Sequence, residues 1–463
     1  MAINRRLPGW YLGLFLFSFA CVQPPKSKFT GAKNEIKFIA LDPGPSHAAL
    51  IQKYNYPVAD SNVYVYTPGR PELAQYLQLI NHYNTRRSFP TNWNEIIVTD
   101  SAFLKKMLHD KPGNVVLIVG INDLKKVYIS KCVGAGLNVL ADNPLVIDTD
   151  GFDSLRNDFI LAGKKRVLLY EIMPERFEIT SELRRAFMMD KAIFGTLRKG
   201  SAGNPAVTFD CTHFLNTYVS GRPLVRPAWF FDPKQQGNGL VDAVSRLVDL
   251  VQWECFPDEV INYESEIDVY GAKHWVTDVS PDQFREITQS RSYPIFLRQY
   301  VSDSVLRAPV NSEIDYRIKG VHARVSVQWY YNSTEIYNEP CFSIMCGTKC
   351  NLVVRQDSVQ QYKKVLFIQP AKGVDTASYS KMLVQKMKTW QSKIKGLAVK
   401  KVRDEWKVMI PDSFQTSNEA RFGLVAEQYF KYLQQGKLPD WEIPAMLAKY
   451  YVTTKALELS RKP

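Results

Sequence analysis

From residue 35 to residue 172, short apolar runs alternate with stretches that have helical spacing. The apolar runs have the length of buried strands and lie at 37–41, 62–66, 95–99, 114–119, 138–141 and 166–170. The helical stretches lie at 47–53, 71–83, 101–109, 124–135 and from residue 152 onward. Strands that alternate with helices form parallel sheets with right-handed crossovers. We therefore predict an α/β fold with an N-terminal parallel-sheet domain over 35–172.

The first strand turns directly into the first helix at 42–46, as in dinucleotide-binding (Rossmann-like) domains, where the helix N-terminus faces a phosphate. The full fingerprint has three glycines, and this turn has only Gly44. Pro43 and Pro45 also remove two backbone donors. The turn therefore fits either a nucleotide site or an ordinary strand-to-helix connection.

Polar residues and glycines follow several predicted strands at the carboxyl edge of the sheet, where such domains bind ligands. The candidate cofactor-binding residues there are Gly44, Ser46, His47, Thr67, Arg70, Gly120 and Asn122. An acidic residue after the second strand would bind a ribose hydroxyl, but this strand is followed by Arg70. An arginine suits a 2′-phosphate, so the residues favour NADP over NAD.

The formal net charge is +13, but no arginine-rich block, zinc-ligand spacing or RNA-binding signature accompanies it. The lysines of the C-terminal half alternate with apolar residues, which is typical of a solvated face. We therefore expect no nucleic-acid partner.

The N-terminus has the features of a signal peptide over 1–21: Arg5 and Arg6 precede a short apolar run that ends at Ala20. Residues 18–21 resemble a bacterial lipobox with Cys21 as the lipidated residue, and 22–34 form a polar tether. We expect an exported protein, periplasmic or anchored in the membrane through Cys21, of a Gram-negative-type bacterium. Cleavage after Ala20 without lipidation is the alternative.

Six further cysteines would be exposed to an oxidising compartment. They are Cys132, Cys211, Cys255, Cys341, Cys346 and Cys350. The last three form a cluster that lacks a fourth ligand at zinc-site spacing, with His322 as the nearest preceding histidine. Buried or locally paired cysteines are favoured over a metal site, and the pairing among these three stays open.

Several motifs together resemble the glucose–fructose oxidoreductase and inositol dehydrogenase family (Gfo/Idh/MocA), and more narrowly its exported members with a distinctive C-terminal domain. The motifs are Leu41-Asp-Pro-Gly44 with His47-Ala-Ala49, and the segments 136–144, 169–180, 221–230 and 236–249. They extend from about residue 36 to 260, with weaker agreement through 347–349.

In that family the second domain is an open, mostly antiparallel sheet flanked by helices, and the resemblance implies an α+β substrate domain over 173–463. Alternating patterns predict strands at 316–331, 351–355, 363–368 and 397–410. Helices are predicted at 379–395, 420–433 and 441–459. Segment 257–315 is expected to form long loops, and 347–349 a hairpin tip.

The resemblance also implies hydride transfer between NAD or NADP and a sugar carbon. The family positions a lysine and an Asp-x3-His pair at the substrate, but here those positions hold Asn143 and, after Asp242, Arg246. Asparagine carries no charge and arginine cannot accept a proton, so Asp242 or His213 is the candidate base. The resemblance adds Asp142, Pro144 and Arg176 to the cofactor site.

Three functions are compatible with these residues. The chain is an NAD(P)-dependent oxidoreductase acting on a small carbohydrate, a degenerate carbohydrate- or nucleotide-binding lipoprotein that keeps the fold, or a structural envelope protein with a vestigial cleft. A homo-oligomer is possible in each case. The substrate and the choice between NAD and NADP stay open.

Overall fold

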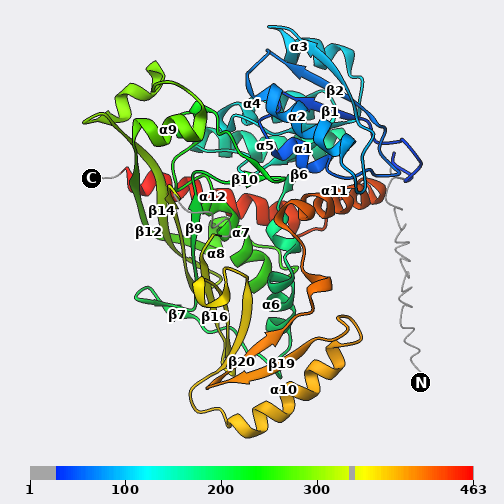
Figure 1. The fold of residues 1–463 in the computed structure, drawn as a ribbon. Coiled ribbons are helices and arrows are strands. Elements are labelled where there is room, and N and C mark those ends of the chain that lie inside the picture. Colours follow the sequence, from blue (N-terminus) through cyan, green and yellow to red (C-terminus); the bar gives the residue numbers. More distant parts are fainter. Residues whose placement is uncertain (1–27, 333–338, 462–463) are drawn as a thin grey trace, which may run out of the picture.

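The computed structural model describes residues 28–332 and 339–461. The first sheet is parallel and has the strand order β3-β2-β1-β4-β5-β6 (Figure 1). Its strands are β1 (Phe38–Leu41), β2 (Asn62–Thr67), β3 (Asn94–Thr99), β4 (Val115–Ile118), β5 (Asn138–Asp142) and β6 (Leu169–Ile172). The helices between them are α1 (His47–Ile51), α2 (Glu72–Thr85), α3 (Phe103–Asp110), α4 (Asn122–Gly134) and α5 (Thr149–Lys165). The prediction of a parallel α/β domain is therefore confirmed.

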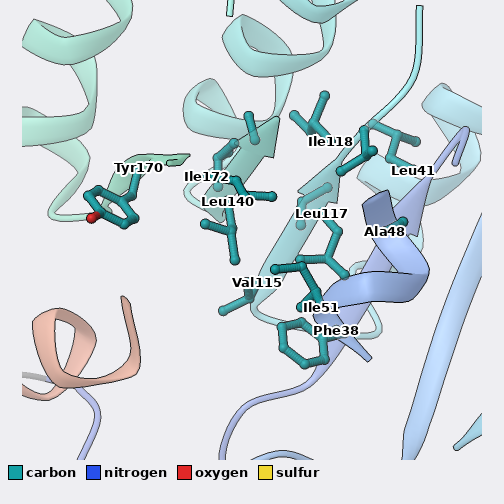
Figure 2. Packing of buried hydrophobic residues seen from close by; sticks show 14 of the residues in the cluster. Phe38, Leu41, Ala48, Ile51, Val115, Leu117, Ile118, Leu140, Tyr170 and Ile172 are labelled. Carbon is teal, nitrogen blue, oxygen red and sulfur yellow. The ribbon is translucent and has the colours of Figure 1, made fainter. Parts of the chain in front are cut away.

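The central strands of this sheet are apolar because helices cover both faces. Every residue of β1, β4 and β6 is buried. Figure 2 shows Phe38, Leu117 and Leu140 in one continuous core. The strand order reverses between β1 and β4, and ligands of such sheets bind at this point.

The second sheet has ten strands in the order β12-β14-β15-β9-β16-β17-β18-β20-β19, with β13 paired to β14. It is antiparallel except where β15 runs parallel to β9. The first five of its strands in the chain are β9 (Val207–Phe214), β12 (Ile267–Val279), β13 (Val301–Ser302), β14 (Val305–Ile318) and β15 (Val321–Tyr330). The others are β16 (Cys341–Cys346), β17 (Cys350–Gln356), β18 (Val365–Pro370), β19 (Ala398–Val402) and β20 (Glu405–Met409).

The expectation of long loops over 257–315 is wrong. This segment holds β12, most of β14, and two helices, α8 (Tyr263–Glu266) and α9 (Pro281–Thr288). The single strand predicted over 316–331 is two strands, because the chain turns at Lys319 and Gly320, both with positive φ. The hairpin tip at 347–349 is confirmed, since it joins β16 to β17.

The remaining helices are α6 (Ile179–Met189), α7 (Val244–Cys255), α10 (Thr376–Trp390), α11 (Asn418–Gln435) and α12 (Glu442–Ser460). Short 3₁₀ helices lie at η1 (Pro174–Phe177), η2 (Ala228–Phe231), η3 (Ile295–Tyr300), η4 (Ser358–Gln360) and η5 (Asp412–Phe414). Two hairpins pair β7 (Gly200–Ser201) with β8 (Asn204–Pro205) and β10 (Tyr218–Val219) with β11 (Arg222–Pro223).

The C-terminal helices α11 and α12 run between the two sheets in Figure 1. Phe422, Tyr429 and Phe430 of α11 belong to the core of the first sheet, and the ring of Tyr429 stacks on Tyr170 at 5.7 Å. Ala448 and Val452 of α12 belong to the core of the second sheet, so both cores depend on residues from the end of the chain.

The predicted signal peptide and most of the predicted tether lie outside the described residues. The last part of the tether, from residue 28, is described, and Phe29 packs against the first core. In residues 28–332 and 339–461, no helix is both long and apolar enough to cross a membrane.

Candidate active site between the two sheets

A cavity of about 1310 Å³ separates the carboxyl edge of the first sheet from one face of the second sheet. Ligand pockets usually measure about 300–1,000 Å³, so this cavity has room for more than one small ligand. The second sheet contributes side chains from β9, β15, β16, β17, β18 and β20.

The first sheet contributes its strand-to-helix loops to the cavity. The predicted cofactor-binding residues that line it are Gly44, Ser46, His47, Gly120, Asn122 and Asp142. The Gly44 N–H donates to the Val119 carbonyl at 2.6 Å, and a Cβ on Gly120 would lie 2.7 Å from the Asp42 carbonyl. The loops after β1 and β4 therefore approach so closely that position 120 requires glycine.

Thr67 and Arg70 do not line this cavity. The Arg70 Nε donates to Asp42 Oδ2 at 3.0 Å, and the Tyr128 hydroxyl donates to the same oxygen at 3.0 Å. A 2′-phosphate at Arg70 would therefore compete with the carboxylate of Asp42 for the guanidinium. This pairing weakens the argument for NADP.

Asp142, at the end of β5, forms a close pair with His47. The two side chains meet at 2.7 Å between Nδ1 and Oδ2, and the buried Lys125 Nζ lies 4.0 Å from the same carboxylate oxygen. Burial opposes ionisation, but His47 and Lys125 hold the pKa of Asp142 well below its usual range. Asp142 is therefore a fixed negative charge at the cavity wall.

Lys125 was not among the residues predicted from the sequence. Its Nζ donates to the carbonyls of Asp142 and Pro144 at 2.9 and 3.1 Å, and so holds the turn that carries Asn143. Pro144 itself does not line the cavity.

Asn143 lines the cavity but is fully engaged by hydrogen bonds. Its Nδ2 donates to Glu171 Oε1 at 2.7 Å, and its Oδ1 accepts from the Ser245 hydroxyl at 2.8 Å. Both partners come from elements far apart in the chain, β6 and α7. Asn143 therefore ties the first domain to the second.

Arg176, predicted to bind the cofactor, does not line the cavity. Its guanidinium is 5% exposed and donates to both Asp249 carboxylate oxygens and to Glu442. These buried ion pairs hold Arg176 in the protein interior, so its position does not support the predicted role in cofactor binding. Although burial acts in the opposite direction, Arg176 and Lys449 lower the pKa of Asp249 to about 2.

Asp242 and Arg246 line the cavity at the start of α7. Burial raises the pKa of the Asp242 carboxyl, although Gln236 and Arg246 partly offset that effect. The Arg246 Nη1 lies 3.6 Å from Glu175 Oε1. A carboxyl with a raised pKa can exchange protons, and the neighbouring arginine supplies a fixed positive charge.

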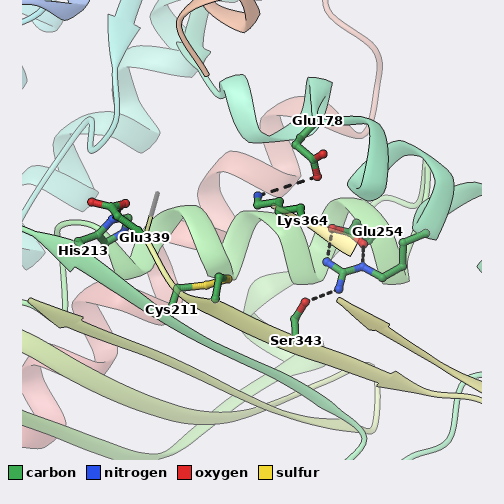
Figure 3. The surroundings of a disulfide bond; sticks show 9 residues. Glu178, Cys211, His213, Glu254, Glu339, Ser343 and Lys364 are labelled. Carbon is green, nitrogen blue, oxygen red and sulfur yellow. Dashed lines mark hydrogen bonds and ion pairs between the residues drawn. A yellow bond between two sulfur atoms is a disulfide. The ribbon is translucent and has the colours of Figure 1, made fainter. Parts of the chain in front are cut away.

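His213 extends from β9 into the same cavity. Its Nδ1 lies 2.6 Å from Glu339 Oε2 (Figure 3). Its ring lies 4.8 Å from the ring of Trp329. Although burial raises it, the pKa of Glu339 is lowered overall by His213 and the Phe214 N–H. Because Glu339 orients Nδ1, Nε2 is the ring nitrogen available to exchange a proton.

Glu339 was not predicted from the sequence. It lies 126 residues from His213 and has no motif of its own. The antiparallel pairing of β9 with β16 brings the two side chains together, and only the sheet register could have revealed them.

A disulfide joins Cys211 of β9 to Cys341 of β16. Both residues line the cavity, and each lies two positions from a member of the His213–Glu339 pair (Figure 3). Cys346 and Cys350 are free, so the cluster does not pair internally. In the described part of the chain, no group of three or more His, Cys, Asp or Glu residues is placed to hold a metal ion.

The cavity therefore brings together two proton-exchanging groups and a fixed cation. His213 and Asp242 can accept a proton, and Arg246 can stabilise a developing oxyanion. These groups face the sheet edge at which parallel α/β domains bind ligands.

The comparisons with known proteins agree with this architecture. A family model described as "Putative oxidoreductase C terminal domain" matches residues 183–461. A structure described as a putative oxidoreductase from Parabacteroides merdae is 44% identical, with a TM-score of 0.91 over 94% of this chain and 99% of that one. No curated protein matches the chain.

More distant structures share the fold alone. Levoglucosan dehydrogenase in complex with NADH and levoglucosan is 12% identical, with a TM-score of 0.56 over 92% of this chain and 96% of that one. A 3-ketoreductase from Actinomadura kijaniata with NADP and TDP-benzene is also 12% identical, with a TM-score of 0.52 over 90% and 96%. Since the family model spans more than half of the chain, the protein belongs to the oxidoreductase family defined by this C-terminal domain, and its fold is of the Gfo/Idh/MocA type.

Proposed function

We propose that this protein is an NAD(P)-dependent oxidoreductase that acts on a sugar or sugar derivative. The observation that carries the proposal is the convergence of His213, Asp242 and Arg246 on one cavity with the nucleotide-facing loops of the first sheet. The bound ligands of the distant structural relatives, NADH with levoglucosan and NADP with TDP-benzene, support it.

The residues at the carboxyl edge fit a dinucleotide in part. Ser46 and Asn122 offer polar groups to the cavity, whereas the close approach at Gly120 is to the Asp42 carbonyl. Pro43 and Pro45 remove two backbone donors from the turn, so we expect phosphate binding to rely on side chains. The Arg70–Asp42 pair leaves no strong preference between NAD and NADP.

When bound, a nicotinamide supplies the hydride acceptor. We assign His213 as the group that takes the hydroxyl proton through Nε2, while Glu339 orients the ring and stabilises the imidazolium. Arg246 stabilises the alkoxide that precedes hydride loss, and it cannot itself take the proton. Asp242, with its raised pKa, is the second proton acceptor near the same position.

The test compares the full chain with His213→Gln and Glu339→Gln in NADH binding and in sugar-dependent NAD(P)H formation. We expect unchanged NADH affinity and a fall in kcat of roughly 10²–10⁴-fold for His213→Gln, since proton transfer is worth about that much. His274→Gln, on the exposed outer strand β12, is the matched control and should leave kcat unchanged. Full activity in His213→Gln with loss of activity in Asp242→Asn would assign the base to Asp242 instead.

A degenerate binding protein is the second candidate, and a specific observation favours it. Asn143 stands where the family has its lysine, and its amide cannot supply the positive charge of a lysine. Its amide groups are also hydrogen-bonded to Glu171 and Ser245. Under this alternative the protein retains nucleotide or sugar but produces no NAD(P)H with any sugar tested. Purified protein that binds neither a nicotinamide nucleotide nor a sugar would reject both candidates.

We also propose that the protein is exported and anchored through Cys21. The support is the signal-like sequence over 1–21, which lies outside the described residues. The wild-type protein should be found in the membrane fraction. The Cys21→Ala variant should be absent from that fraction and soluble in the periplasm. Identical distribution of the two proteins would reject lipidation and leave export intact.

A further inference from the structure

The cavity extends well beyond His213 along the face of the second sheet. Three strand spacings of about 4.8 Å each separate β9, which carries His213, from β18, which Lys364 immediately precedes. In Figure 3, His213 and Glu339 lie at one end of this face, the disulfide in the middle, and Lys364 at the other end. We call the part of the cavity around Lys364 and Arg421 the distal arm.

Two of the cations that line the distal arm are Lys364 and Arg421. Lys364 makes a long ion pair with Glu178 (Figure 3), whereas Arg421 makes no ion pair with a carboxylate among the described residues. The nearest carboxylate oxygen to the Lys364 Nζ is Glu178 Oε2, at 3.9 Å. Arg421 is only 8% exposed, its Nε reaches the Ser417 carbonyl at 3.4 Å, and its Nη1 has no hydrogen-bond partner among the described residues.

Two carboxylates, Glu175 and Glu178, lie on the same wall, and each has a partner besides Lys364 and Arg421. Glu178 accepts hydrogen bonds from the Thr180 and Ser181 N–H groups as the N-cap of α6. Glu175 lies 3.6 Å from Arg246, and its Oε2 has no hydrogen-bond partner in the described part of the chain. Neither carboxylate makes a direct ion pair with Arg421.

Lys363, Lys407 and Arg184 also line this wall, and Arg184 donates to Glu254 and to the Ser343 hydroxyl. Burial lowers the pKa of both Lys364 and Arg421, although Glu178 partly offsets that effect. Arg421 would therefore gain from an anionic ligand, because a charge-assisted hydrogen bond replaces solvation that burial has removed, and Lys364, which keeps part of its exposure, would add a second positive charge.

Resting on the oxidoreductase function above, we propose that the distal arm binds an anionic group of the substrate through Lys364 and Arg421. The separation from His213 requires a substrate longer than one sugar ring, so its class is an acidic disaccharide or glycoside. The anionic group is a carboxylate or a phosphate, which share the chemistry that a guanidinium and an ammonium recognise.

The experiment measures binding of three disaccharides to the full chain by calorimetry at low ionic strength. The probes are cellobiose, cellobiouronic acid and 6′-phosphocellobiose, which differ only in the group at one end. We expect at least one acidic probe to bind tenfold or more tightly than cellobiose, and the better of the two identifies the anionic group.

Lys364→Gln and Arg421→Gln should each remove most of this preference and leave cellobiose affinity unchanged. Lys388→Gln, which makes the same charge change on the exposed face of α10, should retain it. Equal affinity for the acidic and neutral probes, or an acid preference that survives both substitutions, overturns the proposal. NADH binding is measured in parallel: if it fails while the acid preference holds, the oxidoreductase function is wrong and the anion subsite stands.

Discussion

At the scale of single residues, Glu95 of β3 is a carboxyl whose ionisation opposes folding. Its Oε1 accepts from the Gln52 side chain at 2.7 Å and its Oε2 from the Tyr76 hydroxyl at 2.9 Å. Burial raises the pKa of Glu95 to about 7, and the two donors only limit that rise.

Glu95→Gln should therefore stabilise the protein above pH 7. Between about pH 4 and 7 the folded state binds a proton that the unfolded state has released, so the free energy of unfolding falls as pH rises. The gain at pH 8 is on the order of 2 kcal/mol, measured by urea unfolding of both proteins at pH 5 and pH 8. A difference between the two proteins that does not change with pH would contradict this explanation.

The sequence predicted the site residues that local strand and loop ends place at the cavity. It did not predict the positions that depend on contacts between distant segments of the chain. Asp242, His213, Arg246 and Asn143 all line the cavity because their loops and strands end at it. Glu339, by contrast, joins the site through its contact with His213, which is 126 residues away in the chain. Arg176 lies outside the cavity lining because it forms a buried ion pair with Asp249. Such long-range pairing follows from sheet register and core packing, and local motifs do not encode it.

At the scale of elements, the junction of β9 and β16 holds the proposed catalytic pair. The Cys211–Cys341 disulfide fixes these strands beside His213 and Glu339. Replacing both cysteines with serine should lower kcat by about tenfold, because small displacements of reacting groups are costly, and stability should fall by about 2–4 kcal/mol. Cys346→Ser on β16 is the control; it removes a free thiol of the same strand and should change neither quantity.

Steady-state kinetics and thermal unfolding, each with and without a reducing agent, distinguish the two effects. Wild-type protein under reducing conditions should approach the double variant. If reduction lowers stability but kcat is unchanged, the disulfide supports the sheet without positioning Glu339.

Elements were predictable where their pattern reflects burial. The central strands β1 and β4 are apolar throughout and were predicted to within a residue at each end, whereas β12 was not predicted. β12 is an edge strand with one neighbour, β14, and most of its residues are partly or fully exposed. A strand of that kind lacks the apolar run that identifies a buried one.

At the scale of the whole molecule, the two domains share their interior through the C-terminal helices. Lys449 of α12 pairs with Glu171 of β6 and, at 3.1 Å, with Asp249 of α7, and all three are buried. Removing one charge from such a network leaves the others uncompensated, so the network opposes any separation of the domains. Because Glu171 also accepts a hydrogen bond from Asn143, the network holds a residue of the candidate cavity in place.

Tyr429→Ala tests whether the domains unfold as one unit. The Tyr429 ring is fully buried, and its hydroxyl donates to the Val139 and Leu168 carbonyls at 3.1 and 3.2 Å. Truncation should cost about 4 kcal/mol, as for other large buried side chains. α11 packs in the first core, and α12, which follows it, contributes residues to both cores. Hydrogen-exchange protection should therefore fall together in β5 of the first sheet and β16 of the second.

Lys431→Ala, on the exposed face of the same helix, is the matched control and should leave protection in both strands unchanged. If β5 alone lost protection in Tyr429→Ala, the first sheet would open independently of the second. The cavity between the sheets would then open and close with α11. Because only the closed form would bind NADH, the apparent NADH affinity of Tyr429→Ala would fall in proportion to the population of the closed form.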